Sequence, residues 1–436
     1  MTLIVVCAIL IVLLVSGVPV PFSFGGAILY LIYTLGTDPY ALFASSYTQL
    51  SSFNLLAIPL FILAGGIMEE GKIGEALINW VYTFVGRVKG GLACVTTIAC
   101  AVFGSICGSG AATLSCIGSI MAPQMRDKKY PVGLSAAVAC CAAPLGLLIP
   151  PSAMQILVAW ILNISVLACF LSTVVPGIIL TILMCVCSVF MLRNEKDIVT
   201  EEKLSLTEWK RLFTARTKTA APSLLMPVLI LGGIYSGIMT ATESAGVAVI
   251  YAVPVAMLIY KSMSLKELSK CIRTAATTTG VVMCMIGIVI MMSRLLTQAN
   301  MPQSIMHLML GISDNKYVLL LMINIFLILL GMIMDDASAT LLAAPILFPV
   351  ITRMGVSPYQ FAALLGVNIG MGNITPPSAP FLYLAARIYG TDTGKVIKPA
   401  IFLMIFAYLP TLVFVSLFPD VSLWLPRLVL GGKLNI

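Results

Sequence analysis

The same proline–proline–serine motif occurs twice in this chain, each time in an apolar stretch. One copy is Ile149–Ser152 and the other is Thr375–Ser378. A segment of small and polar residues precedes each copy, Gly108–Thr113 before the first and Asp335–Thr340 before the second. The polar segments are 227 positions apart and the proline pairs 226. Because adjacent prolines remove backbone donors and interrupt a helix, the pattern predicts two equivalent helix breaks, one in each half of the chain.

Interrupted helices supply two kinds of ligand at membrane depth. Helix N-termini present free N–H groups and a partial positive charge to anions, whereas unwound carbonyls and hydroxyls bind hard cations. The predicted sodium-binding residues are Ser105, Gly108, Ser109, Pro150, Asp335, Asp336, Gly372, Thr375 and Pro376. The predicted substrate-binding residues are Gly110, Thr113, Ser152, Asn373, Ser378 and Arg387. Sodium is the only metal expected, because the 12 cysteines form no metal-ligand spacing with the single histidine.

The charged residues of this set have alternative roles. Asp335 and Asp336 either ligate the cation or hold the hairpin tip open, or Asp336 only caps a helix that begins at Ala337. Arg387 either binds the substrate anion or extends to the cytoplasmic surface. Outside this set, Glu243 opens an apolar span and is expected to be a helix cap, with a role as a coupling group as the alternative.

The composition is that of a helical membrane protein. Of 436 residues, 60% are hydrophobic and 10% are charged, and the mean hydropathy is +1.07. The apolar runs are continuous and do not alternate, which excludes a soluble domain and favours transmembrane helices. The net charge of +8 comes from basic residues in short loops, so no nucleic-acid partner is expected. No Gly-x-x-x-x-Gly-Lys-Ser/Thr loop is present, so ATP does not drive this chain directly.

Basic residues around the first polar segment indicate a re-entrant hairpin over residues 90–126. Arg87 and Lys89 precede it, and Arg126, Lys128 and Lys129 follow it. Each arm is shorter than the roughly 20 residues that cross a bilayer. Since basic residues favour the cytoplasmic side, entry and exit on that side accommodate both clusters. A second hairpin over 316–352 has fewer basic flanks and is expected to open from the outside.

The expected fold is an all-α polytopic membrane protein with about ten transmembrane helices, two re-entrant hairpins and two broken helices. The first repeat covers 1–192, with scaffold spans at 1–68, a hairpin at 90–126 and a broken helix at 131–170. A cytoplasmic connector at 193–219, with a short interfacial helix at Leu206–Phe213, leads to the second repeat at 220–418. That repeat has scaffold spans at 224–260, a hairpin at 316–352 and a broken helix at 357–390, and a tail follows at 419–436. Five crossings in each half make this an inverted-topology repeat; twelve ordinary helices are the alternative, which leaves the basic flanks unexplained.

The chain resembles the large membrane subunit (DctM type) of tripartite ATP-independent periplasmic, or TRAP, transporters. The stretches that carry the resemblance are Ile58–Met68, Gly108–Thr113 with Leu148–Ser152, Gly233–Glu243, and Asn368–Gly370 with Thr375–Pro377. Two departures stand out. Ala241 occupies a position where the family usually has proline, and Ser378–Ala379 replaces a frequent valine–glycine pair.

The resemblance implies a sodium-coupled importer of a small organic acid, such as a C4-dicarboxylate or sialic acid, in the bacterial inner membrane. It also implies an elevator motion of the hairpins and broken helices, and no enzymatic activity or organic cofactor. The implied partners are a small membrane subunit of about four helices and a periplasmic substrate-binding protein. Alternatives are a self-sufficient sodium/dicarboxylate carrier, a membrane enzyme that uses Asp335 and Asp336 as a carboxylate pair, and a purely structural role.

Overall fold

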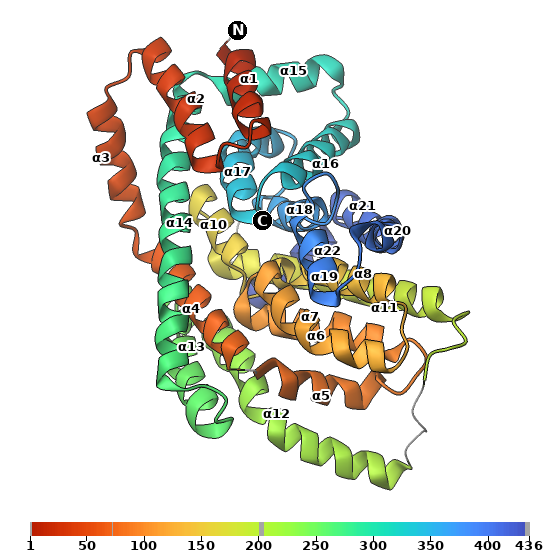
Figure 1. Cartoon of the computed structure of the whole chain (residues 1–436). Coiled ribbons are helices and arrows are strands. Elements are labelled where there is room, and N and C mark those ends of the chain that lie inside the picture. Colours follow the sequence, from red (N-terminus) through yellow and green to blue (C-terminus); the bar gives the residue numbers. More distant parts are fainter. Residues whose placement is uncertain (1, 72, 200–204, 432–436) are drawn as a thin grey trace.

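The computed structural model describes residues 2–71, 73–199 and 205–431, which form helices joined by short turns (Figure 1). The first half contains α1 (Thr2–Val15), α2 (Val20–Leu35), α3 (Pro39–Leu50), η1 (Phe53–Leu56), α4 (Ala57–Glu70), α5 (Ile73–Val85), α6 (Gly91–Cys107), α7 (Gly110–Asp127), α8 (Val132–Ala142), α9 (Leu145–Leu148), α10 (Ala153–Leu162) and α11 (Val166–Leu192). The second half contains α12 (Leu206–Tyr235), α13 (Ala241–Pro254), η2 (Val255–Ile259), α14 (Leu265–Gln298), α15 (Met301–Ile312), α16 (Lys316–Ile333), α17 (Asp336–Arg353), α18 (Pro358–Gly372), α19 (Pro380–Tyr389), α20 (Thr393–Leu403), η3 (Met404–Tyr408), α21 (Leu409–Leu417) and α22 (Asp420–Leu430). Residues 200–204 of the predicted connector and 432–436 of the predicted tail lie outside the described residues.

Local sequence sets the ends of the helices at the hairpin tips. Gly108 ends α6 with a φ of +62°, a left-handed conformation that costs glycine little. The hydroxyl oxygen of Ser109 then accepts a hydrogen bond from the amide of Ala112 and begins α7. Elsewhere, Thr240 and Glu243 form a capping box at the start of α13, which confirms the capping role expected of Glu243.

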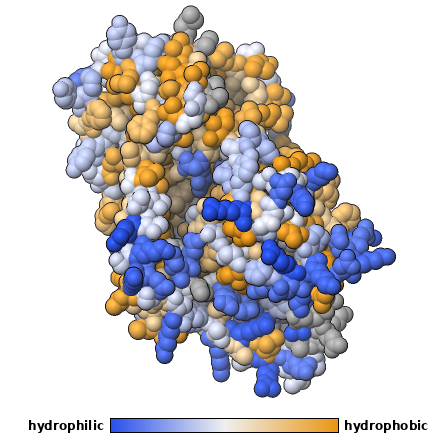
Figure 2. Space-filling view, viewed as in Figure 1, coloured by the Kyte–Doolittle hydropathy of each residue, from blue (hydrophilic) through white to orange (hydrophobic). Residues whose placement is uncertain are grey.

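Helices α6 and α7 form the first hairpin, and α16 and α17 form the second. At the base of the first hairpin, the amide of Leu92 donates to the hydroxyl oxygen of Tyr130 at 3.4 Å. Lys89 donates to the carbonyl of Arg193 at 2.8 Å, so the start of the connector lies at the same end. Hydrophilic side chains gather over this end of the molecule, near α5, α12 and the turn after α13 (Figure 2). We call it the basic end, because it carries Lys89, Arg193 and the segment Lys261–Arg273.

The two halves repeat each other element by element. α10 begins at residue 153 and α19 at residue 380, and α11 begins at 166 and α20 at 393, so both pairs are offset by 227. At the same offset, α3 and α4 together correspond to the single helix α14. The equivalent helices α5 and α15 lie near opposite ends of α14, as an inverted repeat requires (Figure 1). The predicted fold class is therefore confirmed.

Both broken helices are present. The first is interrupted between α9 and α10, and the second between α18 and α19. The peptide bonds Pro150–Pro151 and Pro376–Pro377, which lie in these two interruptions, are cis.

Several element boundaries differ from the prediction. The first broken helix ends at Leu162 rather than at residue 170, because Asn163 adopts a left-handed conformation and Ser165 caps α11. The expected interfacial helix at Leu206–Phe213 is not separate, because it continues through Pro222 into the next span as the 30-residue α12.

In the same way, α14 joins the basic segment 261–273 to the span that follows it. Two helices were not predicted: α3 is short and rich in polar residues, and α5 is amphipathic rather than uniformly apolar. The predicted tail contains α22.

Within the described residues, eight helical segments are long and apolar enough to cross a membrane. They include α16, an arm of the second hairpin, and α8–α10 together as one span. The count omits α1, α2 and α18–α19, because each continuous stretch is shorter than 18 residues. The expected ten crossings result if those three stretches are counted and the hairpin arm is not, so the number of crossings stays a prediction.

Candidate functional site

The tip of the first hairpin packs directly onto the first helix break. A Cβ built on Gly108 would lie 2.9 Å from the carbonyl oxygen of Pro151, closer than real side chains approach. One turn earlier in α6, a Cβ on Gly104 would lie 2.5 Å from the Cα of Gly146. Glycine at these positions lets one backbone touch the other, as small residues do between membrane helices. The predicted tip and break are therefore parts of one site.

The second half repeats this contact. A Cβ on Gly372 would lie 2.6 Å from the carbonyl carbon of Gly331 in α16. Ser378 donates its hydroxyl to the carbonyl oxygen of Met332, close to the second tip. The second break is thus joined to the second hairpin, although Ser378 is exposed whereas Ser152 of the first motif is fully buried.

The two halves also meet each other at the breaks. A Cβ on Gly370 in α18 would lie 2.9 Å from the Cβ of Pro144, just before the first break. A Cβ on Gly110, at the first tip, would lie 2.8 Å from the ring of Phe381, just after the second break. Both breaks and the first hairpin tip therefore lie in one packed region, as the inverted repeat predicts.

Two buried oxygens at the breaks have no hydrogen-bond partner within the described part of the chain. They are Oγ of Ser152 and Oδ1 of Asn373, on side chains that are 0% and 1% exposed. An unsatisfied buried polar atom costs about 1–3 kcal/mol, so such atoms are few and need an explanation. A ligand bound between tip and break would supply the missing partner, and both residues fit the predicted site.

Three other predicted ligands donate to the backbone of their own segment. The hydroxyls of Ser105, Thr113 and Thr375 bond to carbonyl oxygens three or four residues earlier, at 2.6–2.7 Å. Each oxygen keeps lone pairs that can accept a hydrogen bond or coordinate a cation. Pro150 is buried and Pro376 is partly exposed, in keeping with the different depths of the two motifs.

Asp335, not Asp336, caps the second arm. The carboxylate of Asp335 accepts hydrogen bonds from the amide of Ser338, at 3.3 Å, and from its hydroxyl. Asp336 is the first residue of α17, and its carbonyl accepts the hydroxyl of Thr340 at 2.6 Å. The prediction that Asp336 caps a helix starting at Ala337 was wrong by one residue, since helix ends cannot be fixed more closely from sequence.

Arg387 lies away from the breaks. It is exposed in the last turn of α19, nine residues beyond Ser378. At 1.5 Å per helical residue, Arg387 lies roughly 10 Å along α19 from its first residue, Pro380. Arg126, at the base of the first hairpin, donates to the carbonyl of Tyr389 at 3.0 Å, so this end of α19 sits beside the basic end. The structure does not bring Arg387 together with the tips, and its role stays a prediction.

A cavity of about 330 Å³ opens at the first tip. Gly108 and Ser109 form one wall, and α4 and the first turns of α14 form the other. Sequence reasoning missed its two acidic residues, Glu69 and Glu70, although an acidic pair that closes an apolar span is a visible signal. Glu70 pairs with Lys270 of α14 at 3.6 Å.

The chain matches the model of the family described as "Tripartite ATP-independent periplasmic transporter, DctM component" over residues 7–421. The chain belongs to this family. It is 35% identical to the C4-dicarboxylate TRAP transporter large permease protein DctM of Pseudomonas aeruginosa, with 86% of each chain covered. It is 31% identical to the sialic acid TRAP transporter large permease protein SiaM of Vibrio cholerae, over 96% of this chain and 97% of that one.

Among solved structures, the DctM-family chain is similar to the YdaH transporter of Alcanivorax borkumensis. The TM-score is 0.62 at 13% identity, with 88% of this chain and 90% of the other covered, so the likeness concerns the fold alone. The chain is thus a multi-pass membrane component of a transporter and not an enzyme.

One polar network of this DctM-family chain was not predicted. Asn368 of α18 donates to Oδ1 of Asn324 in α16 at 2.9 Å, and Asn324 donates to the hydroxyl of Ser416 in α21 at 2.9 Å. All three side chains are buried. The network ties the second hairpin to the second broken helix by hydrogen bonds across helices, in addition to the glycine contact.

Proposed function

We propose that this chain is the large permease subunit of a sodium-coupled importer of small organic acids, with a C4-dicarboxylate, sialic acid or a similar carboxylate as substrate. The observation that carries the proposal is a pair of buried oxygens, Ser152 Oγ and Asn373 Oδ1, which have no hydrogen-bond partner among the described residues and lie at two helix breaks that face hairpin tips. The names of the relatives indicate the substrate class.

The chemistry of the tips and breaks suits both ligands. Hydroxyl, amide and carbonyl oxygens are the donors that a hard cation such as sodium prefers. Helix N-termini at Gly110 and Ala153 point backbone N–H groups and a partial positive charge toward the same region, which suits a carboxylate. Sodium entry is a sufficient energy source, because one charge moving down 100 mV releases roughly 2.3 kcal/mol.

An elevator motion fits the arrangement of the elements. In this proposal the hairpins and broken helices move together, because the glycine contacts and the asparagine network join them. The remaining spans, above all α4 and α14, form the scaffold. The cavity at the first tip borders the first turns of α14 and Glu70, which pairs with Lys270 at the basic end, so the conformation described here opens toward the cytoplasm under the positive-inside rule.

The subunit acts with two partners in the bacterial inner membrane and periplasm. One is a small membrane subunit of about four helices, and the other is a binding protein that delivers the substrate. The word "tripartite" in the family description supports this proposal. The second candidate is a self-sufficient sodium/dicarboxylate carrier of related inverted-repeat fold.

Uptake into liposomes tests both. The chain is reconstituted with and without the proposed small subunit and binding protein, and uptake of a C4-dicarboxylate and of sialic acid is followed with and without a sodium gradient. Uptake that needs all three components and sodium supports the proposal. Sodium-driven uptake by the chain alone favours the self-sufficient carrier.

A pair of serine variants tests the site itself. Ser152→Ala removes the unpartnered hydroxyl at the break, and Ser188→Ala removes one that is equally buried and unpartnered within the described residues but lies in α11. We expect Ser152→Ala to raise the substrate concentration for half-maximal uptake about tenfold, because the substrate loses one hydrogen-bond partner. If the two variants behave equally, the hydroxyl at the first break is not part of the substrate site.

A further inference from the structure

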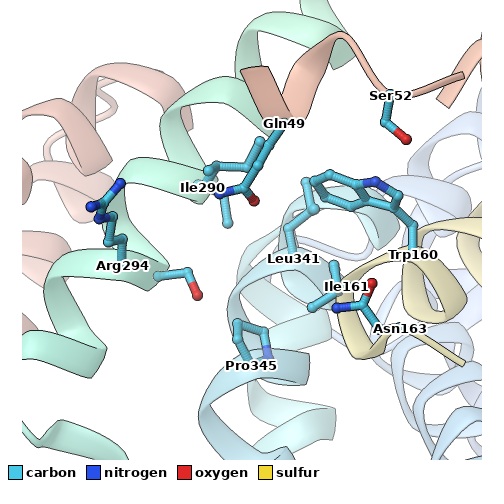
Figure 3. A pocket seen from close by; sticks show the side chains of 11 residues that line it. Gln49, Ser52, Trp160, Ile161, Asn163, Ile290, Arg294, Leu341 and Pro345 are labelled. Carbon is cyan, nitrogen blue, oxygen red and sulfur yellow. The ribbon is translucent and has the colours of Figure 1, made fainter. Parts of the chain in front are cut away.

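A second and larger cavity, of about 630 Å³, lies apart from the tips and breaks. Its walls come from four elements, as Figure 3 shows: Gln49 and Ser52 from the end of α3 and the turn after it, Arg294 from α14, Trp160 from α10, and Leu341 from α17. Gln49 projects between Arg294 on one side and Trp160 on the other (Figure 3). The cavity thus lies between the proposed scaffold and the proposed moving part.

The lining offers a cation and several hydrogen-bonding groups. Within the described part of the chain, the guanidinium of Arg294 makes no ion pair, and the side-chain amides of Gln49 and Asn163 make no hydrogen bond. Ser52 adds a hydroxyl, and the indole of Trp160 adds a flat apolar face that is partly exposed. Five guanidinium donors in a planar fork match the geometry of a carboxylate.

The cavity is on the side of the molecule opposite the basic end. It borders α14 at residues 289–294, whereas the cavity at the first tip borders α14 at residues 271–278. Between the centres of these segments, the helix rises roughly 25 Å. Since the basic end is cytoplasmic under the positive-inside rule, the larger cavity faces the outside.

The charges of the two cavities are opposite, and the inverted repeat does not require this. At the offset of 227, Arg294 corresponds to Ile67, and Glu69 corresponds to Leu296. Neither counterpart lines the other cavity. Among the described lining residues, the outer cavity has a cation and no carboxylate, whereas the inner cavity has two carboxylates and no cation. This difference distinguishes an entrance for anions from an exit.

We propose that the outer cavity is a capture site, which binds the carboxylate substrate on the outer side before it reaches the hairpin tips. Arg294 pairs with the carboxylate, Gln49 and Asn163 hydrogen-bond its remaining polar groups, and Trp160 covers its carbon chain. At the inner cavity, the carboxylate of Glu69 repels the same anion and favours its release, whereas Glu70 is paired with Lys270. The inference rests on the proposed import of a carboxylate.

Binding is tested without transport. Trp160 reports from inside the cavity, so intrinsic fluorescence of the purified chain is titrated with succinate and with sialic acid in sodium-free buffer. We expect a saturable change for one of them that Trp160→Phe abolishes. Arg294→Gln should weaken binding roughly tenfold. This is at the low end of the cost of losing a charge-assisted hydrogen bond, because the guanidinium is exposed. Arg294→Lys, which keeps the positive charge, should weaken binding less.

Arg273→Gln is the matched control, because it removes a positive charge from an exposed position on the same helix outside both cavities. In the full liposome assay, Arg294→Gln should raise the KM for uptake by a similar factor and leave the sodium dependence unchanged. Equal behaviour of the Arg294→Gln and Arg273→Gln variants, or no fluorescence change with either ligand, would overturn the capture site. If the proposed function is wrong, the wild-type complex takes up neither acid in the liposome assay. The fluorescence titration tests the capture site independently of that result. Retained binding by Arg294→Lys shows that a substitution at this position leaves the fold intact.

Discussion

The contact between Gly104 and Gly146 leaves no space for a side chain between the first hairpin and its broken helix, so we expect alanine at position 104 to disturb both. A methyl group on Gly104 would lie 2.5 Å from the Cα of Gly146 and 2.8 Å from its amide nitrogen. Carbon atoms in contact are about 3.5–4.0 Å apart, so Gly104→Ala forces the two backbones apart by about 1 Å. Neither neighbour is a flexible side chain, so the strain cannot be relieved by a rotamer change.

The magnitude follows from two opposing terms. Overpacking of a close contact costs about 1–3 kcal/mol, whereas alanine in place of glycine inside a helix gains up to about 1 kcal/mol. Gly280→Ala isolates the second term, because Gly280 lies within α14 and a Cβ there meets nothing within 4 Å. We expect Gly104→Ala to lower the thermal midpoint of the purified chain by a few degrees, and Gly280→Ala to leave it unchanged or raise it slightly.

Uptake should respond more strongly than stability. A shift of 1 Å at a binding site costs up to about 100-fold in rate when it displaces the reacting or binding groups, and the hydroxyl of Ser152 lies in the same broken helix as Gly146. Sodium-driven uptake is measured for both glycine variants at equal amounts of reconstituted protein. If Gly104→Ala has the same stability and uptake as Gly280→Ala, the hairpin and the break do not touch. That result would refute the packing on which the site is built.

Two further predictions concern the hairpins. Asp335→Ala should destabilise the chain by about 1 kcal/mol in thermal unfolding, because the cap on α17 is lost. Asp335→Asn keeps a capping oxygen and should therefore keep the stability. A changed sodium dependence of uptake in the asparagine variant would show that the charge itself takes part in sodium binding. Cysteines placed at Lys89 and Lys129, in a background without the exposed Cys284, should react with an impermeant thiol reagent from one side of the membrane, and a cysteine at Arg353 from the other. Labelling of Lys89 and Lys129 from opposite sides would contradict the re-entrant hairpin.

The sequence contained the outline of the fold because its strongest signals are local. Paired prolines interrupt helices wherever they occur, and a fixed offset between two such pairs marks a repeat. Basic flanks on both sides of a short apolar hairpin indicate its entry and exit. These signals located both hairpins and both breaks to within a few residues.

What the sequence did not show depends on tertiary contact. α5 is amphipathic because α6 and α12 cover it on one side, and a search for uniformly apolar runs passes over such a helix. α12 and α14 continue through polar segments that were expected to be separate from the spans, because a helix that extends beyond the apolar span loses nothing in water. The outer cavity combines residues from four separate elements, and no spacing along the chain connects Gln49 with Arg294.

The two helix breaks share a backbone plan but offer different ligands. At the offset of 227, Asn373 corresponds to Gly146, so only the second break carries an amide at that position. At the proline motifs the difference is reversed: the Ser152 hydroxyl is buried and unpartnered within the described residues, whereas the Ser378 hydroxyl is exposed and already donates to Met332. Glycine contacts between hairpin and broken helix are kept in both halves because they hold the shape, and the oxygen donors are free to diverge because each meets its own ligand. Under the proposed function, the two halves therefore provide two chemically distinct binding places on one repeated framework.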